Sequence, residues 1–169
     1  FFEHFFEIKG DRLLENSERI ITGLAQLGGQ TVMIVAQEGS DLNNSIEGLT
    51  STDFRKCTRA IKIASRFNIP IVTFIDTVGH NMSYEEELKG IGISLGETML
   101  AMAELPSPSI SILIGTGGNE TALSLDITDR RLMLENSILV LGDNRDDHDD
   151  LNQPTIIGAS ECKDLNIID

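Results

Sequence analysis

The chain has 169 residues, of which 40% are hydrophobic, and it carries a formal net charge of −14. This length and composition favour a single domain with its own hydrophobic core, which we expect to cover residues 1–169. The acidic balance argues against a nucleic acid partner, because binding to phosphates needs a basic surface. No apolar run reaches the roughly 18 residues that cross a bilayer, so we expect no membrane segment.

The two cysteines, Cys57 and Cys162, lie far apart and lack the spacing of metal ligands. We therefore expect free thiols in a reducing cytoplasm and no metal bound by this chain. The acidic run from Asp143 to Asp150, DNRDDHDD, does not fit a calcium-binding loop. Its sixth position is not glycine, and Pro154 stands where the bidentate glutamate belongs. A solvated loop is the expectation there.

The first half of the chain begins with two strand-like runs, 19–27 and 31–37, on either side of Gly28-Gly29. A glycine pair between two such runs predicts a β-hairpin. The segment 39–52 follows and is rich in Asn, Ser and Gly, which indicates a loop.

A helix is predicted next, because apolar residues recur at helical spacing from Phe54 to Ala64. Thr52 or Asp53 can cap its start, and Pro70 bars its continuation. The apolar run 71–76 that follows is typical of a strand buried in a parallel sheet.

The same alternation then repeats towards the C-terminus. We expect a helix at 84–104, a strand at 109–115, a short helix at 119–128 and a further strand region at 130–142. Strands alternating with helices at this spacing predict right-handed crossovers and a largely parallel sheet.

Ligands of such sheets bind beyond the C-terminal ends of the strands. Gly117 and Gly118 lie at one such end, in IGTGGNE, and precede a predicted helix. Their N–H groups, with those of Asn119 and Glu120, could point at an anion that the helix dipole also favours. The alternative is a plain strand-to-helix turn, in which the glycines serve only the backbone.

Side-chain candidates are few. His80 follows Gly79 at the end of the other strand, in IDTVGHN, and is either a general base or a solvated loop residue. Asp76 at the same end either caps the next turn or takes part in chemistry. The chain has no G-x-G-x-x-G, no phosphate loop and no G-x-S-x-G, which argues against nucleotide binding and against a serine hydrolase.

Five segments occur in a characteristic order: FFEIKGDR, IVTFIDTVG, IGTGGNETAL, DRRLMLENS and CKDLNIID. This ordered set resembles the alpha subunit of bacterial acetyl-CoA carboxylase carboxyltransferase. The resemblance implies an α/β crotonase-like (ClpP/crotonase) fold, in which repeated ββα units form two roughly perpendicular sheets with flanking helices. The glycine hairpin would belong to one such unit.

The resemblance also implies an activity: transfer of a carboxyl group from carboxybiotin to acetyl-CoA, giving malonyl-CoA for fatty acid biosynthesis in the cytoplasm. Biotin would be carried by a partner, the biotin carboxyl carrier protein. A zinc-containing beta carboxyltransferase subunit would complete the site within an oligomer and hold much of the acyl-CoA. Backbone N–H groups in glycine-rich turns would hold the enolate oxygen of biotin.

Six positions follow as candidates. The catalytic amides implied by the resemblance are those of Gly79, Gly117 and Gly118. The residues expected to bind substrate are His80, Asn119 and Glu120.

The turn departs from the family pattern G-E-G-G-S-G-G-A-L, because its second glycine pair is here Glu120-Thr121. A carboxylate about 5 Å from an enolate costs roughly 3 kcal/mol at an effective dielectric near 20. Two alternatives therefore stay open. One is a catalytically impaired homologue that serves as an interaction or regulatory subunit. The other is a different crotonase-type acyl-CoA enzyme in which Glu120 or His80 acts as the base.

Overall fold

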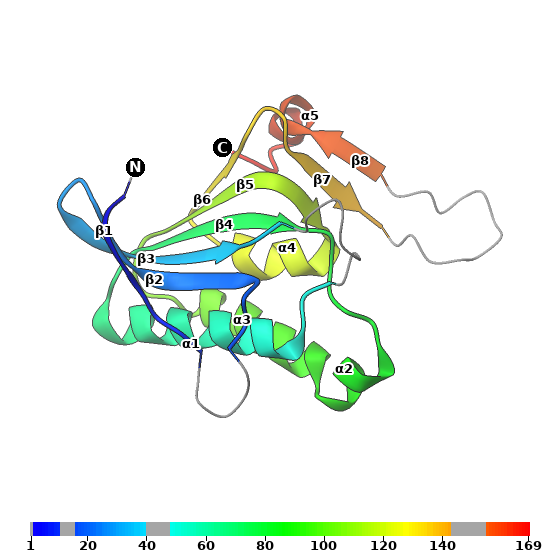
Figure 1. Ribbon diagram of the computed structural model, residues 1–169. Helices are drawn as coiled ribbons and strands as arrows, with labels where there is room; N and C mark the ends of the chain where they lie inside the picture. The colour runs from blue at the N-terminus through cyan, green and yellow to red at the C-terminus, as the bar shows by residue number, and fades with distance from the viewer. Residues whose placement is uncertain (1, 11–15, 40–47, 143–154) are drawn as a thin grey trace.

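The computed structural model describes residues 2–10, 16–39, 48–142 and 155–169, and its centre is a mixed β-sheet (Figure 1). The strands are Glu3–Glu7 (β1), Ile20–Leu27 (β2), Gln30–Gln37 (β3), Ile71–Thr77 (β4), Ser109–Gly118 (β5), Arg130–Met133 (β6), Ile138–Leu141 (β7) and Thr155–Gly158 (β8). The helices are Ser51–Phe67 (α1), Tyr84–Leu88 (α2), Ile91–Ala103 (α3), Asn119–Asp126 (α4) and Ala159–Asp164 (α5).

The strands pair in the order β1-β2-β3-β4-β5-β7-β8, and β6 also pairs with β5. The predicted hairpin is confirmed: β2 and β3 are antiparallel, and Gly28 and Gly29 have φ angles of 56° and 81°, which favour glycine. The predicted parallel centre is confirmed as well, because β4 is parallel to β3 and to β5. Strand β1, which pairs with β2, was not predicted from the sequence.

Strand β5 is the point at which the sheet branches. Its first half pairs with β6, in the register Ile110 to Arg130, and its last residues pair with β7, in the register Gly117 to Leu139. The predicted strand region 130–142 is therefore two short strands that use different parts of one neighbour. Hydrogen bonding joins the described strands into one branched sheet, where the resemblance implied two perpendicular sheets.

The main core lies between the sheet and helices α1, α3 and α4, which share one side of it (Figure 1). Side chains on successive residues of a strand point to opposite faces, so alternate residues of strands β2 to β5 reach this core. The largest buried apolar side chains in it are Ile20, Met33, Val35, Phe54, Ile61, Ile71, Ile75 and Leu125.

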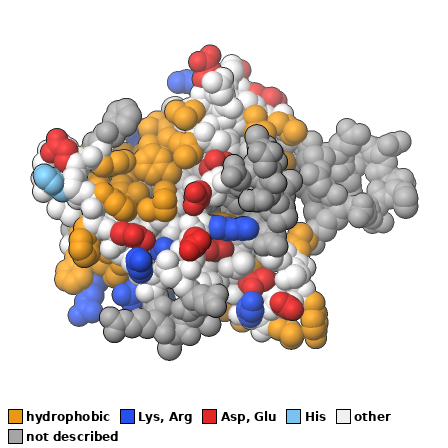
Figure 2. Space-filling model, viewed as in Figure 1, with side chains coloured by type: hydrophobic (Ala, Val, Ile, Leu, Met, Phe, Trp, Pro, Cys, Tyr) orange, Lys and Arg blue, Asp and Glu red, His pale blue; other side chains and the backbone are white. Residues whose placement is uncertain are grey.

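The opposite face of the sheet carries a second apolar cluster. It consists of Ala25, Val32, Ile34 and Val72, against which Phe2, Ala36, Phe74 and Ile112 pack. The rings of Phe2 and Phe74 meet edge to face with centroids 5.9 Å apart. Figure 2 shows hydrophobic side chains gathered over this part of the molecule, on the side that the helices leave open.

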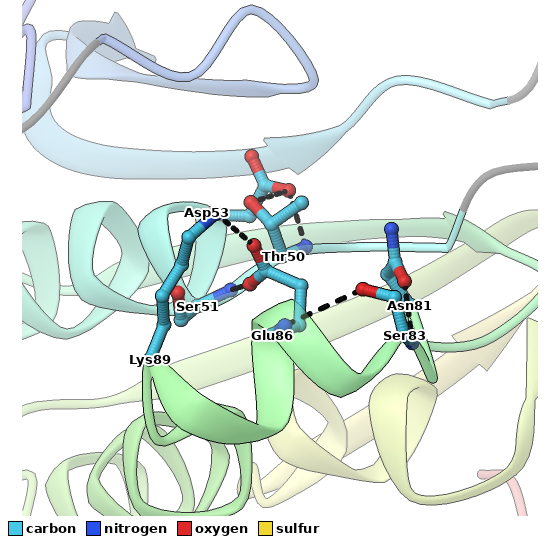
Figure 3. A network of polar contacts seen from close by, with 7 residues as sticks. All are labelled: Thr50, Ser51, Asp53, Asn81, Ser83, Glu86 and Lys89. Atoms are coloured by element: carbon cyan, nitrogen blue, oxygen red, sulfur yellow. Dashed lines mark hydrogen bonds and ion pairs between the residues drawn. The ribbon is translucent and has the colours of Figure 1, made fainter.

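Helix α1 begins two to three residues earlier than the sequence predicted. Its N-cap is Thr50, not Thr52 or Asp53, because Asp53 stands at the third helical position and closes a capping box. The Asp53 carboxylate accepts hydrogen bonds from the Thr50 N–H at 2.6 Å and the Thr50 hydroxyl at 2.9 Å (Figure 3).

The predicted continuous helix 84–104 is wrong. It is broken into α2 and α3 at Gly90, whose φ of 76° lies in the left-handed region and lets the chain change direction.

Glu86 fixes this broken helix against α1. The side chain is only 6% exposed, and its carboxylate accepts hydrogen bonds from the Ser51 N–H and from Lys89 Nζ, both at 2.7 Å (Figure 3). Burial alone would raise the pKa of Glu86, but the hydrogen bonds from Lys89 and Ser51 outweigh it, so the pKa is lowered. Ser83 caps α2 in the same region, since its Oγ accepts the Glu86 N–H.

Replacing Glu86 with glutamine is expected to lower the free energy of unfolding by about 2 kcal/mol at neutral pH, because the amide oxygen can accept only one of the two hydrogen bonds and the carboxylate charge is lost. A carboxylate with a lowered folded pKa stabilises above its ordinary pKa, and this stabilisation is lost as the pH falls through the folded value. The gap between the protein and the variant should therefore close below about pH 4. Urea titrations across pH measure it, and Glu87→Gln, an exposed change on the same helix, is the control. A gap that persists in acid would contradict this assignment.

The remaining expectations concern cysteines, metals and membranes. Cys57 and Cys162 are both free and buried, and burial raises the pKa of each thiol. Within the described ranges, no helix is long and apolar enough to cross a membrane. The same ranges contain no cluster of three or more His, Cys, Asp or Glu suited to a metal. The acidic run from Asp143 to Asp150 lies outside the described residues.

Candidate functional site

The two predicted strand ends lie next to each other in the sheet. Thr77, the last residue of β4, pairs with Gly117 in β5, and α4 begins at Asn119 directly after the last residue of β5. Gly117 and Gly118 are therefore strand residues, in register with Leu139 and Val140 of β7, and no separate turn stands between strand and helix.

Gly118 is a glycine because backbone approaches it closely. A Cβ there would lie 2.6 Å from the carbonyl carbon and oxygen of Val78, a distance that real Cβ atoms do not adopt. A Cβ on Gly117 would meet only the side-chain tips of Leu113 and Leu139, at 3.0 to 3.2 Å. Both glycines are buried. Their close packing explains the residue type without a ligand, and the oxyanion role of their amides stays a prediction.

Asp76 joins the two strand ends, which differs from the predicted cap of the next turn; a part in chemistry stays a prediction. Its Oδ1 accepts a hydrogen bond from the Thr116 N–H at 2.9 Å. The carboxylate occupies space that only glycines leave free, since a Cβ on Gly39 or Gly115 would lie within 2.3 Å of it. Asp76 therefore clamps β4 to β5 and sets where the ends of both strands lie.

Three hydrogen bonds made by its backbone hold the segment after β4 in place. Gly79 adopts a φ of 141°, and its carbonyl accepts the Leu49 N–H at 2.9 Å. The Leu49 carbonyl accepts the Asn81 N–H at 2.8 Å, which makes an isolated parallel bridge around His80. The Gly79 N–H donates to the Thr77 hydroxyl at 3.3 Å. These contacts fix the position from which the His80 side chain projects.

His80 and Glu120, one from each strand end, meet directly. His80 Nδ1 lies 2.6 Å from Glu120 Oε1, and the two side chains are 18% and 41% exposed. His80 is thus a paired, mostly covered residue, and the solvated alternative does not describe it. A histidine held through one nitrogen by a carboxylate keeps its other nitrogen for a second proton partner. The pair can therefore bind or move a proton.

A pocket of about 430 Å³ opens beside this pair, between α4, strands β5 to β7 and the C-terminal segment. Asn119 and Glu120 line it, whereas Gly117 and Gly118 do not. Asp126, at the other end of α4, also lines it, and burial raises the pKa of its carboxyl despite a hydrogen bond from Ser111 and the nearby charge of Arg131.

Sequence reasoning found the residues of this site but missed their arrangement. It placed Gly79, His80 and Glu120 at strand ends, and the structure brings His80 and Glu120 into contact. The contact gives no local signal, because 40 residues separate the two side chains and only the parallel pairing of β4 with β5 joins them.

The sequence and the fold of this chain are similar to those of known carboxyltransferases. Residues 1–142 match the family described as acetyl co-enzyme A carboxylase carboxyltransferase-like. The chain is 37% identical, over 81% of its length, to the acetyl-coenzyme A carboxylase carboxyl transferase subunit alpha of Gemmatimonas aurantiaca, of which it covers 44%. It is 33% identical, over 99% of its length, to the same subunit of Nitrosomonas europaea, of which it covers 57%. The chain thus spans about half the length of these relatives.

A third relative, from Clostridium tetani, carries the name of subunits beta/alpha; it is 42% identical over 83% of the chain, which covers 25% of that protein. Among solved structures, the beta subunit of geranyl-CoA carboxylase from P. aeruginosa superposes with a TM-score of 0.70 at 14% identity, over 81% of this chain and 25% of that one. The transcarboxylase 12S structure superposes with a TM-score of 0.68 at 19% identity, over 80% of this chain and 26% of that one. These superpositions confirm the predicted carboxyltransferase-type, crotonase-like fold.

Proposed function

This chain belongs to the acetyl co-enzyme A carboxylase carboxyltransferase-like family, and from that premise we propose that it is an alpha-type carboxyltransferase subunit. Its reaction is the transfer of a carboxyl group from carboxybiotin to acetyl-CoA, giving malonyl-CoA. The observation that carries the proposal is the family match over residues 1–142, because that range contains both strand ends and the His80–Glu120 pair.

The paired charge at the site supports this proposal. An unpaired Glu120 carboxylate would repel the electron-rich oxygen that develops during carboxyl transfer. His80 lies 2.6 Å from that carboxylate, and in its protonated form it neutralises the charge. The half-buried Asn119 lies beside them on the pocket wall and offers a side-chain amide as a neutral donor.

Biotin, carried on a partner protein, suits these residues as a ligand. The Asn119 amide and the His80–Glu120 pair can bind its polar ring, and the apolar wall of the pocket lies beside them. When bound, biotin supplies the transferable carboxyl group. Asn119 would orient the ligand, His80 would hold the proton that balances Glu120, and Asp76 would keep both strand ends in place through Thr116.

The proposed partners follow from the same role. They are a beta carboxyltransferase subunit, which completes the site, and a biotin carboxyl carrier protein, and the assembly is an oligomer in the cytoplasm. The chain covers about half of the alpha subunits that it resembles, so the partner surfaces must be found by experiment.

The reverse reaction tests the proposal. The protein, a beta subunit, biotin and malonyl-CoA are mixed, and formation of acetyl-CoA is followed. We expect turnover that needs both chains. An intact complex, seen by size-exclusion chromatography, that shows no turnover would favour an interaction or regulatory subunit instead. Replacing Glu120-Thr121 by Gly-Gly in that case asks whether these two residues abolished the activity.

The His80–Glu120 contact favours one second candidate, an enzyme that moves protons on an acyl thioester without a carrier. Decarboxylation or hydrolysis of malonyl-CoA by this protein alone, lost in His80→Ala and in Glu120→Gln, would support that candidate over carboxyl transfer.

A further inference from the structure

We propose that the pocket beside α4 binds an aliphatic chain of medium length, such as the acyl chain of a coenzyme A thioester. The inference rests on the proposed function, because it concerns the acyl group offered to the same site. It goes beyond that function, since acetyl-CoA carries only a two-carbon acyl group.

The size of the pocket is the first argument. An engineered cavity of about 150 Å³ lined by Leu, Ile and Phe binds benzene, a ligand of six carbons. The pocket beside α4 measures about 430 Å³, nearly three times as much. It is far larger than an acetyl group needs and has room for a chain longer than six carbons.

The lining is the second argument. Apolar side chains from several elements face the pocket, among them Leu113 of β5, Leu123 of α4, Leu132 and Met133 of β6, and Leu139 of β7. Such a wall gains free energy from an apolar ligand in proportion to the apolar area that the ligand removes from water.

The charges around the pocket are the third argument. Glu120 is paired with His80 at 2.6 Å. Asp126 lies within the field of Arg131 and accepts the hydroxyl of Ser111, so neither of these charges stands alone. A pocket whose acidic side chains already have polar partners favours a neutral chain over an added ion.

Polar side chains at one end of the pocket set the orientation of the bound ligand. Asn119 and Glu120 line the pocket at the start of α4, next to the ends of β4 and β5. The thioester end of the ligand would lie there, near His80, and the chain would run along α4 towards β6. A free fatty acid has the same chain, but it would bring a carboxylate to the end of the pocket where a thioester brings a neutral group.

A chain-length series tests the proposal at equilibrium, with the whole protein and without a beta subunit. Calorimetric titrations compare acetyl-, butyryl-, hexanoyl- and decanoyl-CoA, and the matching free acids. Each methylene that enters the pocket should raise the affinity about fourfold until the pocket is full. Steeper gains for thioesters than for free acids would identify the thioester as the source. Affinity that does not change with chain length would overturn the proposal.

Matched variants place the binding at this pocket. Leu123→Asp, on its wall, should weaken decanoyl-CoA binding at least tenfold, whereas Leu100→Asp on α3 should leave it unchanged, although the two leucines are similarly exposed at 51% and 57%. Leu132→Asp on β6 is a second wall variant, for use if the first does not fold. Equal binding by wall and control variants would contradict the assignment.

The outcome is separable from that of the proposed function. Turnover with acetyl-CoA together with a flat chain-length series would leave carboxyl transfer in place and overturn only the aliphatic pocket. Tight decanoyl-CoA binding without turnover in an intact complex would uphold the pocket and reject the carboxyltransferase role.

Discussion

Replacing Gly118 with alanine is expected to lower the free energy of unfolding by about 3 kcal/mol or more, or to prevent folding. The added Cβ would lie 2.6 Å from the backbone carbonyl of Val78, directly after β4, and backbone tied to a strand end cannot move aside as a side chain can. The strand ends of β4 and β5 would have to separate, which would also displace His80 and Glu120. Urea unfolding followed by far-UV circular dichroism measures the loss.

Gly117→Ala is the matched control on the neighbouring residue. Its Cβ would meet the flexible ends of Leu113 and Leu139 at 3.0 Å or more, so we expect a loss of about 1 kcal/mol. Equal losses for the two variants would show that the close approach of Val78 does not explain the second glycine.

Replacing His80 with alanine is expected to slow carboxyl transfer by about 100-fold in the complex with a beta subunit. The Glu120 carboxylate would then face the developing negative charge without a partner. At about 5 Å and an effective dielectric near 20, that repulsion costs roughly 3 kcal/mol, which corresponds to about two powers of ten in rate. Stability should change little, because the His80–Glu120 pair is partly exposed to solvent.

The double variant His80→Ala/Glu120→Gln separates charge from shape. It removes the imidazole and the carboxylate charge together, so most of the lost rate should return. A double variant as slow as His80→Ala would mean that the imidazole itself takes part in the reaction. If His80→Ala alone kept full activity, Glu120 would lie too far from the developing charge to affect the rate.

Local patterns predicted the elements that depend on local chemistry. Gly28-Gly29 identified the hairpin, the apolar spacing from Phe54 identified α1, and the run 71–76 identified β4. The errors in the predicted helices lay at their ends, where a single residue determines the boundary. Gly90 ends α2 by adopting a left-handed conformation, and Asp53 shifts the cap of α1 to Thr50.

The candidate site could be predicted only as a set of residues at strand ends. The glycines of β5 suggested an open turn, but Gly118 is required because the Val78 carbonyl, directly after β4, approaches it closely. His80 drew attention as a possible base at a strand end and Glu120 as a departure from the family pattern, yet their contact depends on the register of β4 and β5. Strand pairing over such separations is a tertiary property that no window of sequence contains.

Carboxyl transfer itself is tested most directly with malonyl-CoA labelled at its free carboxyl carbon. The protein, a beta subunit and biotin are incubated with the labelled thioester, and label on biotin is separated from label released as bicarbonate. The account predicts label on biotin only when both chains are present. Label that appears solely as bicarbonate, or no reaction in an intact complex, would contradict it.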